Sequence, residues 1–226
     1  MNSEQHFDKI AKGYDYWKEK NYYYYRNLVE LYRELIPASA SVLEIGCGTG
    51  DILARLNPKQ GRGVDISGEM IALAQSKYHN HSNLVFERED IMATKATFNQ
   101  SFIFLADVLE HISDLPAFLN QLSRRTGPDN TVIISVANPL WEPILMVAEK
   151  LGQKMPEGPH QRIPVSQTEK ILKTAGFKIQ ERGYRLLVPK KIWGSDWINQ
   201  KFYRWPVVRH LGFTVFWVLK KAGKTV

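Results

Sequence analysis

The sequence predicts an α/β fold with a seven-stranded, mostly parallel sheet, helices on both faces of the sheet and an antiparallel last strand. Short apolar runs alternate with helical patterns along the 226 residues, which is typical of a parallel sheet. A glycine-rich turn, "GCGTG" at 46–50, joins the first strand to a helix, where α/β proteins bring their backbone close to a ligand. Apolar residues make up 44% of the chain, so we predict one domain over residues 1–226.

The first half of the chain alternates strands and helices. A helix over 20–36 has apolar residues at three-to-four spacing and ends before Pro37, and we predict N-terminal helices over 1–37. Ser67 is a good N-cap for a later helix. We then predict strands at 42–46, 61–66, 84–88, 101–106 and 131–137, and helices at 51–56, 68–78 and 115–125.

The second half is less regular. Residues 138–165 contain five prolines, and we predict that this insertion covers the substrate side of a site at the strand ends. A basic, aromatic segment at 189–212 lies between the last two strands, so it is an insertion in the closing hairpin. The remaining elements are a helix at 166–175 with Gly176 at its C′ position, and strands at 177–187 and 213–220.

The net charge of +7 is unevenly distributed. Residues 1–181 hold 20 Lys/Arg and 22 Asp/Glu, a net of −2, whereas residues 182–226 hold 10 Lys/Arg and one acid, a net of +9. Cys47 has no second cysteine to pair with, the first residues are polar, and the longest apolar run is too short to cross a bilayer. These features predict a cytoplasmic protein with a basic tail.

The spacing of the glycines indicates which kind of nucleotide the turn binds. Gly46, Gly48 and Gly50 are two residues apart and follow Glu44, whereas a dinucleotide fingerprint places its third glycine three residues after the second. The pattern E-x-G-x-G-x-G resembles motif I of the class I S-adenosylmethionine-dependent methyltransferases. Asp65 ends the second strand, where a carboxylate can accept hydrogen bonds from both ribose hydroxyls.

Three further segments carry the same resemblance. "REDI" at 88–91 follows the third strand, and "ADVLEHI" at 106–112 follows the fourth. The latter resembles the corresponding segment of small-molecule and lipid methyltransferases. "FDKIAKGYD" at 7–15 resembles the N-terminal lid of these enzymes, including quinone-biosynthesis methyltransferases. The resemblance covers roughly residues 7–180 and implies a Rossmann-like fold with S-adenosylmethionine as cofactor.

The resemblance also assigns residues to the cofactor. Asp90 would meet the adenine amino group and the backbone N–H of Ile91 would meet the ring. Backbone N–H groups of the glycine turn can approach the cofactor carboxylate at a helix N-terminus, and Glu44 can balance its ammonium group. The aromatic ring of Tyr14 suits the sulfonium, and Cys47 is a small packing residue. The expected cofactor-binding set is Tyr14, Glu44, Gly46, Cys47, Gly48, Gly50, Asp65, Ile66, Met70, Asp90, Ile91 and Ala106.

Absent motifs narrow the methyl acceptor. The fourth strand is followed by "ADVL" and lacks the Asp/Asn-Pro-Pro-aromatic tetrad of DNA amino-methyltransferases. Cys47 lies in the glycine turn and cannot serve as the nucleophile for cytosine C5 methylation. Nucleic acid is therefore disfavoured, and a small or lipid-linked acceptor is expected: a lipid, a quinone or a polyprenyl-linked sugar. The alternatives are a soluble metabolite as acceptor, a cofactor-binding protein without activity, and a nucleic-acid-binding module that uses the basic tail.

Histidines are the candidate bases for an acceptor that must lose a proton. We expect His160 to be the base, and His111 is the second candidate. The alternative for His160 is an exposed loop residue and for His111 a capping or packing residue. Asn138, Tyr24 and His160 are the expected acceptor contacts. No metal site is predicted.

The segment 189–212 combines tryptophan with Lys and Arg. Such a composition suits a helix that lies in a membrane interface beside anionic lipid, so we predict reversible docking on an anionic membrane. The alternative is a surface helix packed on the domain, and Pro206 must break either helix. The apolar face is Trp193, Trp197, Phe202, Trp205 and Val208, flanked by Lys190, Lys191, Lys201, Arg204 and Arg209.

Overall fold

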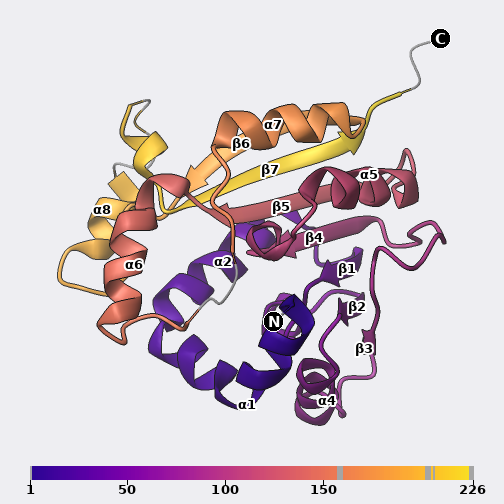
Figure 1. The fold of residues 1–226 in the computed structure, drawn as a ribbon, viewed down its shortest axis with the longest axis horizontal. Coiled ribbons are helices and arrows are strands. Elements are labelled where there is room, and N and C mark those ends of the chain that lie inside the picture. Colours follow the sequence, from indigo (N-terminus) through magenta and orange to yellow (C-terminus); the bar gives the residue numbers. More distant parts are fainter. Residues whose placement is uncertain (1, 157–159, 202–204, 206, 224–226) are drawn as a thin grey trace.

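The computed structural model describes residues 2–156, 160–201, 205 and 207–223. Its seven strands form one sheet in the order β3-β2-β1-β4-β5-β7-β6 (Figure 1). All neighbouring strands are parallel except β7, which runs antiparallel to both β5 and β6. The predicted seven-stranded, Rossmann-like architecture with an antiparallel last strand is therefore confirmed. The strands are β1 (Ser41–Ile45), β2 (Gln60–Asp65), β3 (Leu84–Arg88), β4 (Phe102–Ala106), β5 (Thr131–Ala137), β6 (Phe177–Arg185) and β7 (Thr214–Lys221).

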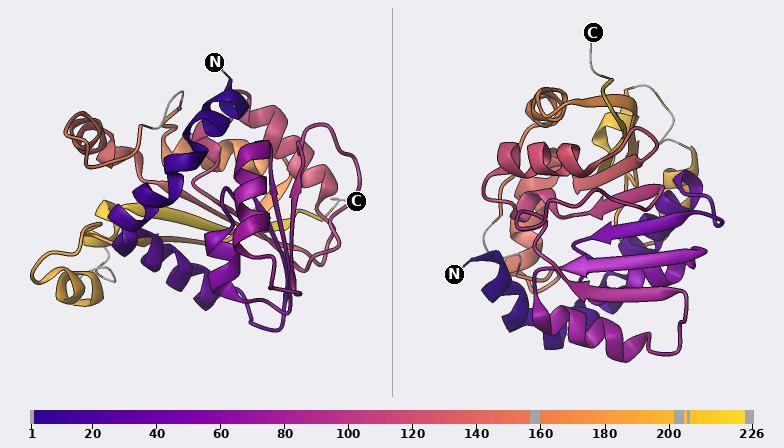
Figure 2. Two further views of the ribbon diagram at one scale, coloured as in Figure 1. Left: turned by 90° about the horizontal axis from the view of Figure 1, so that it is seen from below. Right: turned by 90° about the vertical axis from the view of Figure 1, so that its right-hand side faces the viewer.

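Helices cover both faces of the sheet (Figure 2). On one face, α5 and α7 pack on alternate residues of the central strands, such as Leu43 and Ile103. On the other face, α2, α3 and α4 pack on the intervening residues, such as Val42 and Phe104. The helices are α1 (Ser3–Lys20), α2 (Tyr22–Leu35), α3 (Asp51–Leu56), α4 (Gly68–Lys77), α5 (Leu115–Arg125), α6 (Glu142–Lys150), α7 (Val165–Thr174) and α8 (Ser195–Lys201), with short 3₁₀ turns η1 (Leu109–His111), η2 (Pro139–Trp141) and η3 (Val208–Leu211).

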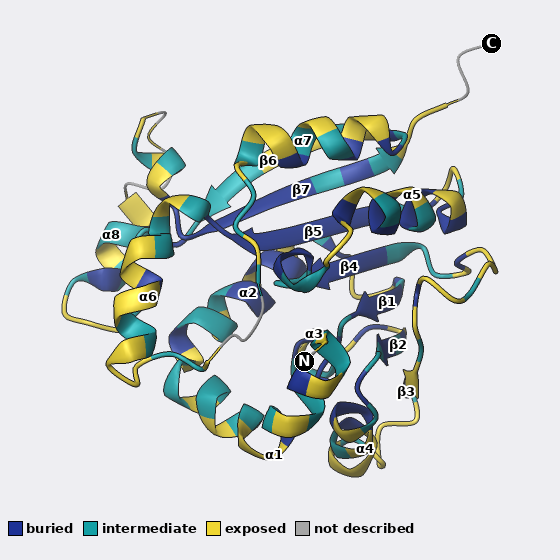
Figure 3. Cartoon of the chain, viewed as in Figure 1, coloured by how far each residue is buried: buried dark blue, intermediate teal, exposed yellow. Residues whose placement is uncertain are grey.

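Because helices cover both faces of the sheet, successive residues of its central strands are buried, instead of every second one. The central strands β1, β4 and β5 are buried along nearly their whole length, which is visible as continuous dark blue in Figure 3. Trp217 of β7 is fully buried in the core on the α5 and α7 side. Its indole N–H donates to Glu169 Oε1 at 3.1 Å.

Two insertions differ from the prediction. The stretch 138–165 contains α6, which begins at Glu142 directly after η2. The basic aromatic segment contains α8 and η3 in place of one long broken helix. The predicted positions of Phe202, Arg204 and Pro206 lie outside the described residues. Strand β6 ends at Arg185, two residues early, because Leu186 adopts a left-handed backbone conformation with φ 65°.

The N-terminal helices cross the carboxyl ends of the parallel strands. Helix α1 begins with a capping box in which Asn2 accepts a bond from the Gln5 N–H. Asn21 separates α1 from α2, whose residues Leu28 and Tyr32 pack on the sheet. Among the residues that the structure describes, no helix has the length and apolar character needed to cross a bilayer.

Candidate functional site

A cavity of about 960 Å³ lies at the carboxyl ends of the parallel strands. Its floor is the glycine turn and the ends of β1, β2, β4 and β5, and its walls come from α1, α2, α6 and the loop that holds His160. Every predicted cofactor residue lines it except Gly50, and the predicted acceptor contact Tyr24 lines it as well. The topology therefore brings together residues from 14 to 160 in one space.

The glycine turn has a backbone that requires glycine. Gly46, Gly48 and Gly50 have φ values of 74°, 52° and 79°, which side chains other than glycine rarely adopt. A Cβ at Gly46 would lie 2.5 Å from Val108, so there is no room for one. Gly48 faces the cavity, where a Cβ would lie 3.3 Å from the ring of Tyr14. Gly46 and Gly48 both line the cavity, so their backbone is exposed to a ligand there.

Gly50 has a different position from the one predicted. It lies outside the cavity as the N-cap of α3, and a Cβ there would lie 2.6 Å from the ring of Phe86. Its role is to allow close packing of the turn on β3. Gly50 was predicted to contact the cofactor, but it is not among the residues that line the cavity.

Asp65 is fixed by the backbone at the end of β2. Its Oδ2 accepts a bond from the Gly48 N–H at 2.8 Å and its Oδ1 accepts one from the Ser67 N–H at 2.9 Å. Burial raises the pKa of this carboxyl, although the two N–H donors oppose the rise. A carboxylate oxygen can accept more than one bond, so both oxygens can also receive hydroxyl donors from the cavity. Ile66, Met70, Asp90 and Ile91 continue the same wall.

Glu44 is a buried acid beneath the glycine turn. Its side chain is 1% exposed, and Oε2 accepts a bond from the Leu53 N–H at 3.1 Å. Burial raises its pKa to about 8, although the charge of Lys18 opposes the rise. Cys47 is also buried, and burial raises the pKa of its thiol well above the usual value. A thiol in this state is a poor nucleophile, in keeping with a packing role.

Helix α1 is fastened to the glycine turn by ionic contacts that the sequence did not reveal. Lys18 Nζ lies 3.0 Å from Asp51 Oδ2 and 3.3 Å from Thr49 Oγ1. The same ammonium lies 4.8 Å from the ring centroid of Tyr14. Burial would raise the pKa of Asp51, but Lys18 and Lys77 hold it well below its usual range. Asp51 is at least 26 positions from each of these lysines, so no local pattern identifies the ion pairs.

Glu110 is the most unusual acid on the acceptor side. It follows β4 and is 6% exposed, and its Oε1 accepts bonds from the Ala137 N–H at 3.1 Å and from Arg162 at 3.2 Å. Its Oε2 has no hydrogen-bond partner among the described residues, yet Glu110 lines the cavity. Burial and the neighbouring charge of Asp107 raise its pKa to about 8. Its position after the fourth strand, beside His111, was the available signal, but only the structure distinguishes it.

Both predicted histidines line the cavity. His160 Nε2 lies 3.1 Å from Glu142 Oε1, on α6. Arg162 Nε donates to the other oxygen of Glu142 at 2.5 Å while its Nη1 reaches Glu110. The ring of His111 packs edge to face on Phe7, with centroids 5.0 Å apart. His160, Glu142, Arg162 and Glu110 therefore form one chain of polar contacts.

Asn138 does not contact the cavity. It is 2% exposed, and its amide donates to the carbonyls of Gly212 at 2.8 Å and His210 at 3.0 Å. Its Oδ1 accepts a bond from the Leu140 N–H at 3.2 Å. Asn138 joins the end of β5 to the end of the basic aromatic segment, and it does not line the cavity where an acceptor contact was predicted. Tyr24 is placed as predicted, and its hydroxyl donates to Asp107 Oδ2 at 2.5 Å.

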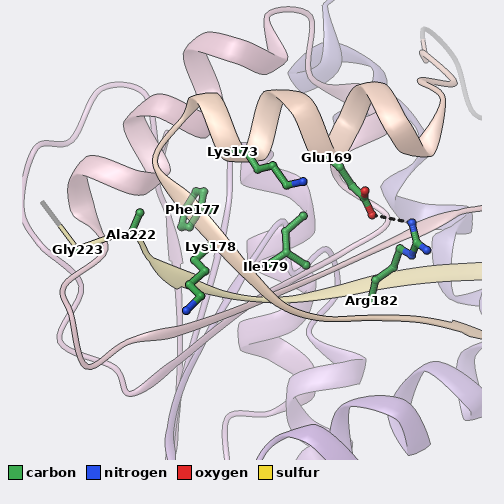
Figure 4. Close-up of a pocket in the computed structure, with 8 residues that line it drawn as sticks. All are labelled: Glu169, Lys173, Phe177, Lys178, Ile179, Arg182, Ala222 and Gly223. Carbon is green, nitrogen blue, oxygen red and sulfur yellow. Dashed lines mark hydrogen bonds and ion pairs between the residues drawn. The ribbon is translucent and has the colours of Figure 1, made fainter. Parts of the chain in front are cut away.

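A second hollow, of about 770 Å³, lies between α7 and β6 (Figure 4). Two of its polar side chains pair with each other: Arg182 lies 3.1 Å from Glu169, which also accepts the bond from Trp217. The hollow contains none of the predicted site residues. We therefore assign the functional site to the larger cavity.

The comparisons with known proteins agree on one family. A family model described as "Methyltransferase domain" matches residues 16–182. An uncharacterised protein of Methanocaldococcus jannaschii is 34% identical over 143 residues, 61% of this chain and 53% of that protein. A ubiquinone biosynthesis O-methyltransferase of Rhodopseudomonas palustris is 24% identical over 53% of this chain and 50% of its own length. The matches span about half the length of these relatives.

Solved structures share the fold over nearly the whole chain. A chain from a complex with the Haloferax volcanii Trm112 methyltransferase activator has a TM-score of 0.71 and 17% identity, with 99% of both chains covered. Magnesium protoporphyrin IX methyltransferase from Synechocystis PCC 6803, solved with bound SAH, has a TM-score of 0.64 and 20% identity, with 97% of both chains covered.

Proposed function

This chain belongs to the methyltransferase family, and on that premise we propose that it methylates a hydroxyl group of a small or lipid-linked acceptor. It is an enzyme, and its cofactor is S-adenosylmethionine. The observation that carries the proposal is the single cavity that extends from the glycine turn to Glu110 and the apolar side of α6. One end suits the cofactor and the other end suits an apolar acceptor with a polar reactive group.

The residues at the glycine end fit the cofactor. Gly46 and Gly48 line the cavity, Asp65 can receive the ribose hydroxyls, and Asp90 and Ile91 can receive the adenine. Glu44, beneath the turn, can face an ammonium group. When bound, S-adenosylmethionine supplies a methyl group on a sulfonium sulfur, which keeps the bonding electron pair as the methyl leaves.

The end of the cavity that would hold the methyl acceptor also contains a candidate general base. As the hydroxyl oxygen gains the methyl, its O–H bond breaks, and Glu110 takes the proton on the oxygen that has no partner among the described residues. Arg162 and the Ala137 N–H hold the other oxygen and orient the carboxyl group. His160 and His111 line the same cavity and remain the alternative bases. Two relatives, the ubiquinone biosynthesis enzyme and a Bacillus cereus malonyl-[acyl-carrier protein] enzyme, are named O-methyltransferases, which supports oxygen as the methylated atom.

A lipid, quinone or polyprenyl-linked sugar is the acceptor class we favour over a soluble metabolite. The wall of the acceptor end includes Trp141, Ile144, Leu145 and Phe213, which suit an apolar molecule. The basic aromatic segment 189–212 adds reversible docking on an anionic membrane from the cytoplasmic side. Nucleic acid is disfavoured as an acceptor.

The test is methyl transfer from labelled cofactor to fractionated extracts. The full chain is incubated with S-adenosylmethionine carrying a labelled methyl group and either a membrane lipid extract or a soluble metabolite extract. Label in the organic phase of the lipid reaction supports the lipid-linked class. Label found only in the reaction with the soluble extract would show that the acceptor is a soluble metabolite and would contradict the lipid-linked class.

We expect Asp65→Ala to weaken S-adenosylmethionine binding by roughly 10- to 100-fold, because it removes two charge-assisted hydrogen bonds. Titration calorimetry measures this directly. NAD, tested at millimolar concentration in the same experiment, should not bind to the wild type. Equal cofactor affinity in variant and wild type would contradict the assignment of Asp65.

Cofactor binding should release protons from Glu44. With a pKa of about 8 this carboxyl is mostly protonated at pH 7 in the free protein, and an ammonium group nearby favours its ionised form. Affinity should therefore rise with pH from about 5 to about 8 and then level off. Calorimetry in buffers of different ionisation enthalpy counts the released protons. In the Glu44→Gln variant the binding enthalpy should no longer depend on the buffer. If that dependence is unchanged in the variant, another group releases the proton.

A further inference from the structure

The exposed apolar residues of this protein are concentrated at one end. Of fifteen large apolar or aromatic side chains exposed in the described part of the chain, eleven lie in two segments, 140–151 and 192–211. Exposed apolar surface concentrated in this way marks an interaction site more often than scattered single residues do. These eleven are Leu140, Ile144, Met146, Val147 and Leu151 in the first segment, and Ile192, Trp193, Trp197, Trp205, Val207 and Leu211 in the second.

The two segments project in the same direction. In Figures 1 and 2, α6 and the chain around α8 both extend beyond the sheet at the same end, on opposite sides of it. Figure 3 shows exposed residues along the outer side of α6. This is the end at which the parallel strands finish and the cavity opens.

The structure fastens both segments to one body. The Trp141 indole N–H donates to the Leu211 carbonyl at 2.8 Å, and Trp141 packs on Phe213 with ring centroids 5.4 Å apart. Tyr23 of α2 donates to Asp196 of α8 at 2.8 Å. Because both segments are held on the same scaffold, they can meet a flat surface together.

The cavity opens between the two segments. Ile144 and Ala148 of α6 line it from one side, and Pro189 and Lys190 line it from the other. Ile144 is both a cavity residue and an exposed one, so the acceptor wall is continuous with the outer apolar surface. An amphipathic molecule could keep its apolar chain outside while its polar end lies in the cavity.

We propose that α6 and the basic aromatic segment together form a two-sided surface that rests on an anionic lipid bilayer, with the acceptor's polar end entering the cavity between them. The charge of the second segment favours an anionic bilayer as the occupant, because this segment carries Lys190, Lys191, Lys201 and Arg209 and a single acid, Asp196. Tryptophan side chains are suited to the depth of the lipid headgroups, and the aliphatic side chains of α6 are suited to the boundary between headgroups and acyl chains. The entry route rests on the proposed function, whereas the docking itself does not.

A pair of valines gives a matched test. Val147 on α6 is 56% exposed and Val85 on the edge strand β3 is 52% exposed. The double variant Val147→Gln/Leu151→Gln and the double variant Trp193→Gln/Trp197→Gln remove apolar surface from one segment each. Val85→Gln removes a similar surface at the far edge of the sheet.

Co-sedimentation with vesicles of phosphatidylcholine containing phosphatidylglycerol is the measurement. We expect the wild type to bind these vesicles, to bind pure phosphatidylcholine vesicles weakly, and to lose binding as salt rises. Each double variant should bind on the order of tenfold or more weakly, and Val85→Gln should bind as the wild type does. S-adenosylmethionine affinity, measured by calorimetry, should be the same in all four proteins and serves as the check on folding.

Three results would overturn the proposal. The wild type could remain in the supernatant with anionic vesicles at low salt. The α6 variant could bind normally while the tryptophan variant does not, which would leave the basic segment as the sole docking element. Light scattering could show a dimer that Val147→Gln/Leu151→Gln converts to a monomer, in which case a second copy of the chain covers this surface. Vesicle binding without methylation of any lipid would instead refute the lipid acceptor and leave the docking intact.

Discussion

Glu110→Gln is expected to lower methyl transfer to a hydroxyl acceptor by roughly 10²- to 10⁴-fold while S-adenosylmethionine affinity stays the same. Glutamine keeps the shape of the side chain and can still accept bonds from the Ala137 N–H and Arg162, but it cannot take a proton. The wild-type rate should rise with pH through the carboxyl pKa of about 8 and level off above it, and the variant should lack this rise. Initial rates with labelled cofactor and the active lipid fraction provide the measurement.

The histidines provide the comparison for this experiment. His160→Gln and His111→Gln should each lower the rate less than Glu110→Gln does. Glu142→Gln removes the carboxylate that holds both His160 and Arg162, so it separates orientation from proton transfer. A large loss in His160→Gln with a normal rate in Glu110→Gln would assign the base to His160, as the sequence suggested. Full activity in all these variants would mean that alignment alone suffices.

Trp217→Ala should lower the free energy of unfolding by about 3–5 kcal/mol. The side chain is fully buried among residues from β5, β7 and α7, and alanine leaves a cavity that rigid strands cannot close. Chemical denaturation with linear extrapolation measures the change. Trp217→Phe should cost less, because it keeps most of the volume and loses the bond to Glu169.

The control is a tryptophan with the opposite environment. Trp193 is 100% exposed, so Trp193→Ala should change the unfolding free energy by no more than about 0.5 kcal/mol. The same residue type then gives a large and a negligible effect in one protein. A small effect at Trp217 would contradict the described packing of β7 in the core.

Local patterns predicted most of the fold and the cofactor half of the site. Strand boundaries such as 84–88 and 131–137 were identified because buried strands are short apolar runs bounded by turns. The acidic residues at strand ends were found for the same reason, since parallel strands bring their carboxyl ends to one edge. The sequence did not separate Gly50 from the glycines that line the cavity, because a glycine needed for packing on Phe86 has the same sequence signature as one needed for ligand approach.

The acceptor half depends on contacts that the sequence does not encode locally. Asn138 follows a strand end as a ligand contact would, yet its amide is taken up by carbonyls more than 70 residues later. Glu110 and Arg162 meet across 52 positions, and only their burial makes the pair chemically distinctive. Helix α6 was missed because prolines at 139 and 143 mark a helix start as readily as a loop.

The attachment of α1 has a consequence for the residence time of the bound cofactor. This helix has two buried residues, His6 and Ala11, and solvent-exposed ion pairs such as Lys77 with Asp15 and Arg88 with Glu4 hold it to neighbouring elements. Polar contacts near solvent weaken with ionic strength, whereas the apolar packing of α2 on the sheet does not. Spent cofactor should therefore leave faster as salt rises, at concentrations that leave the core intact. Release, rather than methyl transfer, would then limit turnover at low salt.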